Sequence, residues 1–99
     1  MIFTTINPAT EEILENYEEM PASLVKQKLN NANEIFPVWK KSTFKERSNR
    51  MFKVADVLRA NKQEYAKLMA LEMGKPLAQG IGEVEKCAWV CDYYAENAE

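Results

Sequence analysis

From Ser23 to the end of the chain, apolar residues recur every three or four positions, and this spacing is the strongest constraint on the fold. An α-helix turns once every 3.6 residues, so side chains at this spacing share one face. Residues 2–20 instead mix β-branched and aromatic residues around the turn signal "NPAT", which predicts a hairpin whose second strand lies near Glu12–Tyr17. The predicted fold class is therefore mainly α, with a short N-terminal β-hairpin (residues 2–20) followed by four amphipathic helices (residues 21–99).

The first predicted helix is strongly amphipathic and begins near Pro21–Ser23. Pro37 should kink or end this helix, because its ring removes one backbone donor and crowds the carbonyl four residues back. The apolar stripe of the helix consists of Val25, Leu29, Ala32, Phe36 and Trp39.

Capping signals mark where the later helices begin. Thr43 and Glu46 have the spacing of a capping box, in which a hydroxyl and a carboxylate each accept a hydrogen bond from a free backbone donor. Asn61 and Glu64 repeat the spacing, which predicts a similar start for the third helix. The fourth helix should open at Pro76–Leu77.

Composition excludes several classes of partner. Ninety-nine residues, 46% of them hydrophobic, form one domain at most. The 13 basic and 15 acidic residues give a net charge of −2, and no basic run interleaves with aromatics, so we expect no nucleic-acid partner. No stretch of 18 apolar residues occurs, and the first ten residues do not resemble a signal peptide, so we expect no membrane partner and a cytoplasmic location.

The chain contains no histidine, which removes the commonest general base and the usual zinc ligands. Cys87 and Cys91 could form a redox or metal site, because a thiolate is both a nucleophile and a soft ligand. No third Cys is present to complete a tetrahedral site, so the favoured interpretation is two small core residues on one helix face. A thiol-dependent enzyme acting through Cys91 stays open as a weaker hypothesis.

Three other patterns could bind a ligand, and each has a structural explanation. The "LEMGKP" segment contains the Gly-Lys pair of phosphate loops but lacks their first glycine, so Gly74 is better explained as a helix C-cap before a helix-starting proline. Glu83, Glu85 and Lys86 could handle protons, and a solvated helix face explains them better. Aromatic residues could stack on a cofactor ring, but their helical spacing favours packing anchors. These aromatics are Trp39, Trp89, Tyr93 and Tyr94.

Longer motifs resemble a known family. The segments "INPAT", "FPVWKKSTFKERSNRMFKVADVLRANKQEYAKLMALEMGKP" and "GEVEKCAWVCDYYAENAE" resemble, in this order and spacing, the amino-terminal part of NAD(P)-dependent aldehyde dehydrogenases. The "EMGKPLAQ" and "GEVEKCAW" patterns are most similar to the succinate-semialdehyde dehydrogenase branch. The resemblance covers nearly the whole chain.

The resemblance implies an α/β dinucleotide-binding domain of which residues 1–99 are one part, a single partial domain. It also implies NAD or NADP as cofactor of the full-length parent, bound by residues further along. The family's catalytic cysteine, general-base glutamate and oxyanion-stabilising asparagine also lie further along, so we expect no catalytic, cofactor-binding or metal-ligating residue in this chain, and no activity from it alone. Because the family's corresponding helix borders the substrate entrance, Gln79 and Glu83 are candidates to line it.

The end of the sequence suggests the front of a longer chain. Its last helical turn holds Glu96 and Glu99, whose charges are unfavourable at the negative end of a helix dipole. The expected partner is therefore the remainder of the dehydrogenase chain, and the exposed apolar faces predict a homo-oligomer. The alternative is a stand-alone helical protein-interaction module.

Overall fold

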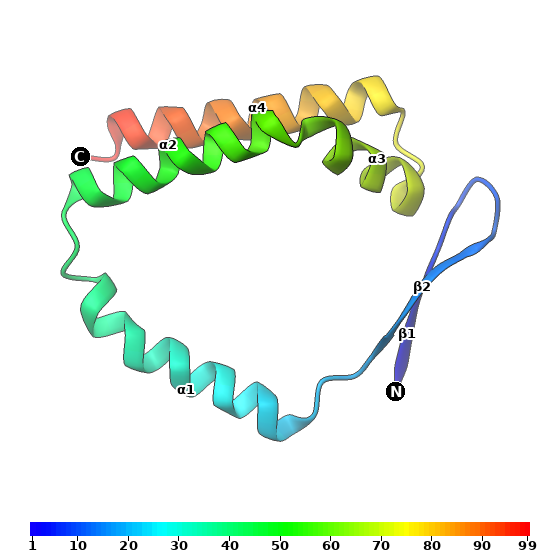
Figure 1. The fold of residues 1–99 in the computed structure, drawn as a ribbon, viewed down its shortest axis with the longest axis horizontal. Coiled ribbons are helices and arrows are strands. Elements are labelled where there is room, and N and C mark those ends of the chain that lie inside the picture. Colours follow the sequence, from blue (N-terminus) through cyan, green and yellow to red (C-terminus); the bar gives the residue numbers. More distant parts are fainter.

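The computed structural model describes residues 1–99, and it confirms a mainly α fold with an N-terminal hairpin and four helices (Figure 1). The strands pair antiparallel, and the second begins one residue later than the sequence predicts. The elements are β1 (Ile2–Ile6), β2 (Ile13–Glu18), α1 (Ala22–Trp39), α2 (Phe44–Ala60), α3 (Lys62–Met73) and α4 (Leu77–Asn97).

The predicted Asn-Pro turn connects the two strands. The backbone N–H of Asn7 donates to the carbonyl of Glu12 over 2.9 Å, and its side-chain oxygen accepts from the N–H of Ala9 over 2.9 Å. The second bond is the local pairing that makes Asn frequent in turns. Glu11 closes the loop in a left-handed conformation with φ of 65°. The turn is therefore determined by residues next to one another in the sequence.

The capping box at the start of α2 is present. The hydroxyl of Thr43 accepts from the backbone N–H of Glu46 over 3.2 Å, and the Glu46 carboxylate accepts from the backbone N–H of Thr43 over 2.6 Å. This backbone donor stabilises the ionised carboxylate and lowers the pKa of Glu46. Both groups of the predicted box therefore satisfy free backbone donors at the helix start.

The second predicted box, at Asn61 and Glu64, is wrong. Helix α2 extends to Ala60, so Asn61 is a single residue between two helices. Its side-chain amide turns back and donates to the carbonyl of Val57 over 2.9 Å, and it does not cap α3. The Asn61 side chain therefore serves the end of α2 and not the start of α3.

The effect expected of Pro37 is seen at the end of α1. This helix ends at Trp39, two residues after the proline.

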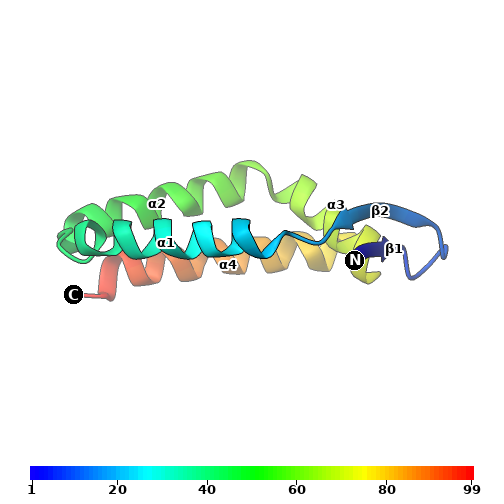
Figure 2. The same cartoon turned by 90° about the horizontal axis from the view of Figure 1, so that it is seen from below.

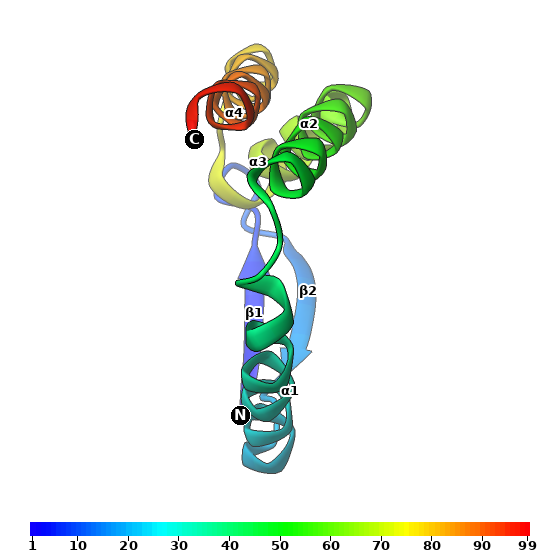
Figure 3. The same ribbon diagram turned by 90° about the vertical axis from the view of Figure 1, so that its left-hand side faces the viewer.

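Small residues form the core where α4 packs along α2 and α3. Ala55 of α2, Ala66 of α3, and Val84 and Ala88 of α4 are at most 2% exposed. A Cβ atom on Gly80 would lie 3.1 Å from the Cβ of Ala66, so α3 and α4 approach too closely for a larger residue. Figures 1 and 3 show α2 and α4 running side by side. This three-helix unit, α2–α4, is the packed part of the chain.

Helix α1 lies apart from this unit and buries no residue, although its sequence is amphipathic. Its predicted stripe is exposed, with Leu29 at 65% and Phe36 at 57%. Figure 3 shows the three-helix unit at one end and α1 with the hairpin at the other, and Figure 2 shows how thin the arrangement is. The radius of gyration is 17.8 Å, whereas a compact chain of this length has about 13 Å. The chain therefore leaves open the apolar face of α1.

We predict that Thr43→Ala lowers the free energy of unfolding by about 1 kcal/mol, because it removes the cap of α2. Asn61→Ala should cost less, since the Asn61 side chain makes one exposed bond at the end of α2. Urea unfolding followed by far-UV circular dichroism measures both. Equal losses for the two variants would contradict the assignment of a single capping box.

The two glycines of α4 differ in the space around them, so substitutions at the two positions should have opposite effects. Gly82→Ala should raise the free energy of unfolding by about 0.5–1 kcal/mol, because a Cβ there meets no atom within 4 Å and alanine favours the helix. Gly80→Leu should lower it, because the side chain would collide with the backbone of Ala66. Thermal unfolding of both variants measures the difference. A stabilising Gly80→Leu would contradict the close approach of α3 and α4.

Candidate functional site

A groove along α4 is the candidate site, and it collects the residues that the resemblance singles out. It has a volume of about 750 Å³. Gln79 and Glu83, one helical turn apart, both line it, and Gly82 and Val90 contribute to its wall. The structure therefore brings the two predicted entrance residues together on one surface, and their role at a substrate entrance stays a prediction. The remaining lining residues are Lys75, Lys86, Cys87 and Cys91.

The groove holds one neutralised and one free cation. Lys75, which precedes α4, forms an ion pair with Glu83, and both side chains remain between a third and a half exposed. Lys86 is exposed and forms no ion pair. Of the residues interpreted as a solvated face, only Lys86 is unpaired. The Lys75–Glu83 pair is neutral, so the one uncompensated positive charge of the groove is that of Lys86.

A second set of charges on α4 faces α2 and α3. Arg59 pairs with Asp92, and its Nε lies 3.9 Å from a Glu85 oxygen. Lys62 donates to Glu85 over 2.6 Å. The hydrogen bond from Lys62 lowers the pKa of Glu85, and the bond to Asp92 raises the pKa of Arg59, because each favours the charged form. These ion pairs orient α4 on α2 and α3. Residue spacing along the sequence could not have predicted them, because the partners lie on different helices.

The core interpretation of the two cysteines is wrong. Cys87 is exposed and Cys91 is half-buried, and both lie on the groove. The stripe that packs on α2 and α3 instead runs through Val84, Ala88 and Ala95. At about 100° per residue, Cys91 lies about 20° and Cys87 about 60° from Val84 around the helix, so both border the packed stripe and lie progressively nearer the solvent. The chain gathers no group of three or more potential metal ligands among its His, Cys, Asp and Glu residues.

The aromatic residues are not packing anchors within these 99 residues. Trp89 is 67% exposed, and Tyr93 and Tyr94, which contact each other edge to face at 5.3 Å, are more than half exposed. Trp39 is 44% exposed. Trp39 lies at the end of α1 and the other three lie on α4, and no element of the chain buries any of them.

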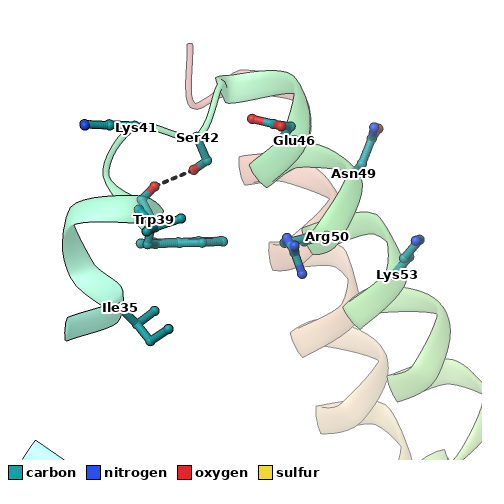
Figure 4. Close-up of a pocket in the computed structure, with 9 residues that line it drawn as sticks. Ile35, Trp39, Lys41, Ser42, Glu46, Asn49, Arg50 and Lys53 are labelled. Carbon is teal, nitrogen blue, oxygen red and sulfur yellow. Dashed lines mark hydrogen bonds between the residues drawn. The ribbon is translucent and has the colours of Figure 1, made fainter. Parts of the chain in front are cut away.

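A second cavity, of about 690 Å³, lies where α1 meets α2 (Figure 4). It is lined by three cations, and Arg50 is directed toward the Trp39 ring, with its guanidinium 5.7 Å from the ring centre. Lys41 and Lys53 extend in opposite directions in Figure 4. The Glu46 carboxylate on its rim is engaged in the α2 cap. Because the cations diverge, this cavity is a weaker candidate for an anionic ligand than the α4 groove.

The Gly-Lys segment is a helix junction, as interpreted from the sequence. Gly74 ends α3 in a left-handed conformation with φ of 68°, and its N–H donates to Ala70. Pro76 then precedes the first residue of α4. A Cβ on Gly74 would lie 3.2 Å from Pro8, so the hairpin turn approaches this junction.

None of the four helices has the length and apolar character needed to cross a membrane.

Comparison with known proteins identifies the family. The sequence model of the "Aldehyde dehydrogenase family" matches residues 1–99. The chain belongs to this family. The match includes the hairpin, α1 and the three-helix unit.

Individual relatives agree. The chain is 41% identical over 99 residues to a probable succinate-semialdehyde dehydrogenase [NADP(+)] of Synechocystis sp., covering 100% of this chain and 22% of that protein. It is 34% identical over 93 residues to a glutarate-semialdehyde dehydrogenase of Pseudomonas aeruginosa, covering 94% and 19%. A succinic semialdehyde dehydrogenase structure from Streptococcus pyogenes, in complex with NADP+, superposes with a TM-score of 0.90 at 34% identity, covering 97% and 21%. The chain thus spans about a fifth of the length of these relatives.

The two lysines of the groove, Lys75 and Lys86, were not among the residues predicted for the entrance. Lys86 follows Glu83 by three positions and Gln79 by seven, so helical spacing alone could have added it to the predicted entrance residues. Lys75 lies outside α4, and only the tertiary structure brings it to Glu83.

We predict that the ion pair of Glu85 makes stability depend on pH. The pKa of Glu85 in the folded state lies below its ordinary value of 4.5, so its stabilising contribution is present above 4.5 and is lost as the pH falls through the lowered pKa. Glu85→Gln should therefore lower the melting temperature at neutral pH and leave a smaller difference from wild type in acid. Glu64→Gln, at an exposed acid without an ion pair, is the control. Parallel pH profiles for wild type and Glu85→Gln would contradict this.

Proposed function

We propose that these residues are part of a succinate-semialdehyde dehydrogenase, which oxidises the aldehyde group to a carboxylate and passes a hydride to NADP+. The observation that carries the proposal is the whole-chain similarity to a probable succinate-semialdehyde dehydrogenase [NADP(+)] at 41% identity. The fold similarity to a succinic semialdehyde dehydrogenase in complex with NADP+ supports the same substrate and cofactor.

The cofactor is held by residues outside this chain. A dinucleotide cradle needs a glycine-rich turn between a strand and a helix, where the backbone can approach the pyrophosphate. The three glycines here are Gly74 at the end of α3, and Gly80 and Gly82 within α4. None follows a strand, so the residues present do not fit the cofactor. The catalytic thiol, the general base and the oxyanion donor are likewise supplied by the remainder of the dehydrogenase, and the 99 residues alone are inactive.

These residues have two roles in the enzyme. The hairpin and α1 pack on the rest of the protein, and α4 contributes to the substrate entrance. The open face of α1 and the hairpin pack on the remainder of the dehydrogenase chain, and apolar surface left over joins copies into a homo-oligomer in the cytoplasm. The extended shape and the exposed Leu29 and Phe36 support this assignment. On α4, the groove with Gln79 and Glu83 borders the path by which the aldehyde enters.

We predict that the natural polypeptide carrying these residues reduces NADP+ when supplied with succinate semialdehyde, whereas residues 1–99 alone do not. Absorbance of the reduced cofactor measures the reaction. An immunoblot of source cells should show a band several times heavier than 11.4 kDa. A native band at 11.4 kDa would contradict the proposal and favour a stand-alone interaction module with the open α1 face as its binding surface.

A further inference from the structure

We propose that Lys86 is a specificity-determining residue that selects aldehydes carrying a carboxylate at the far end of the molecule. This inference rests on the proposed function, and it assigns the substrate recognition of the α4 groove to one side chain. It is carried by the charge distribution along α4 and by the position of Lys86 in the groove.

Lys86 is the only basic residue of α4, whose sequence also holds four acids. Three of these acids are matched by cations from outside the helix. Glu83 pairs with Lys75, Glu85 with Lys62, and Asp92 with Arg59. The fourth acid, Glu96, lies ten positions from Lys86, about 15 Å along the helix. The neighbouring acids are therefore occupied, and Lys86 keeps a free positive charge.

The position of Lys86 places this charge beside the predicted entrance residues. Gln79, Glu83 and Lys86 are spaced by four and three positions, so they form one stripe on α4, about 10 Å long. All three line the groove and are exposed. A small anionic aldehyde entering the groove would therefore meet an amide, a neutralised ion pair and one unpaired ammonium group.

The chemistry of the relatives' substrates matches such a charge. Succinate semialdehyde and glutarate semialdehyde, named in two of the relatives, each carry a carboxylate remote from the aldehyde and differ by one methylene. Lysine is a compact charge on a flexible four-carbon stem, so it can reach a carboxylate at either distance. A charge at the groove attracts the carboxylate before and during reaction alike, so it should act on substrate binding more than on the chemical step.

The test uses the full-length dehydrogenase and two aldehydes of four carbons, succinate semialdehyde and uncharged butanal. Lys86→Met, which keeps an unbranched stem without the charge, should raise KM for succinate semialdehyde roughly fivefold with kcat unchanged. KM for butanal should not change. Lys86→Arg should restore most of the preference, and Lys67→Met, at an exposed lysine of α3 without an ion pair, is the matched control.

A second variant predicts a change of opposite sign. Glu83→Gln removes the negative charge next to Lys86 and releases Lys75, so it should lower KM for succinate semialdehyde and leave butanal unaffected. Rising ionic strength should raise KM for succinate semialdehyde in wild type and have a weaker effect in Lys86→Met, because salt screens an exposed charge.

The outcomes separate the two proposals. A wild-type enzyme that favours succinate semialdehyde over butanal, with Lys86→Met unchanged or altered equally for both aldehydes, would overturn the role of Lys86 alone. A wild-type enzyme that oxidises neither aldehyde would overturn the proposed function and the role of Lys86 with it.

Discussion

The close approach of α3 and α4 at Gly80 and Ala66 is the constraint on which the packed part of the chain depends. A Cβ atom on Gly80 would lie 3.1 Å from the Cβ of Ala66, closer than an ordinary van der Waals contact, and the neighbouring core positions are filled by alanine and valine. Small residues allow helix backbones to approach closely, and close approach orients everything else on the helix surface. With one face of α4 committed to this contact, the ion pairs of Glu85 and Asp92 lie toward α2 and α3, and the groove face stays open.

The same arrangement explains why so much apolar surface is exposed. Only six of 99 residues are buried, and the large side chains of α1 have no counterpart within the chain. Apolar faces of this size on a segment spanning a fifth of its relatives are expected where further protein covers them. Hairpin, α1 and three-helix unit each have regular local structure, and their relative positions match those of solved dehydrogenases.

Expectations that depended on neighbouring residues were largely correct. The Thr43 box, the Asn7 turn and the left-handed Gly74 involve hydrogen bonds or backbone conformations within a few residues, so sequence spacing determines them. Asn61 is the exception, because it lies between two helix ends. Its side chain bonds to the carbonyl of Val57 at the end of α2 and does not cap the start of α3. For the candidate site, the family resemblance singled out Gln79 and Glu83, which line one groove, and missed Lys75 because it reaches Glu83 from outside the helix.

Expectations about burial failed, and for a different reason. Cys87, Cys91 and Trp89 follow the apolar periodicity of α4, but periodicity indicates only that a residue could be buried. Which face is covered depends on the partner element, and α2 and α3 cover the stripe of Val84 and Ala88. The amino-acid sequence by itself determined the elements, the caps at Thr43 and Gly74, and the family, because these depend on local bonds and residue order. Tertiary structure alone decided which side of α4 is buried and which charges remain free, because both depend on contacts between residues far apart in the chain.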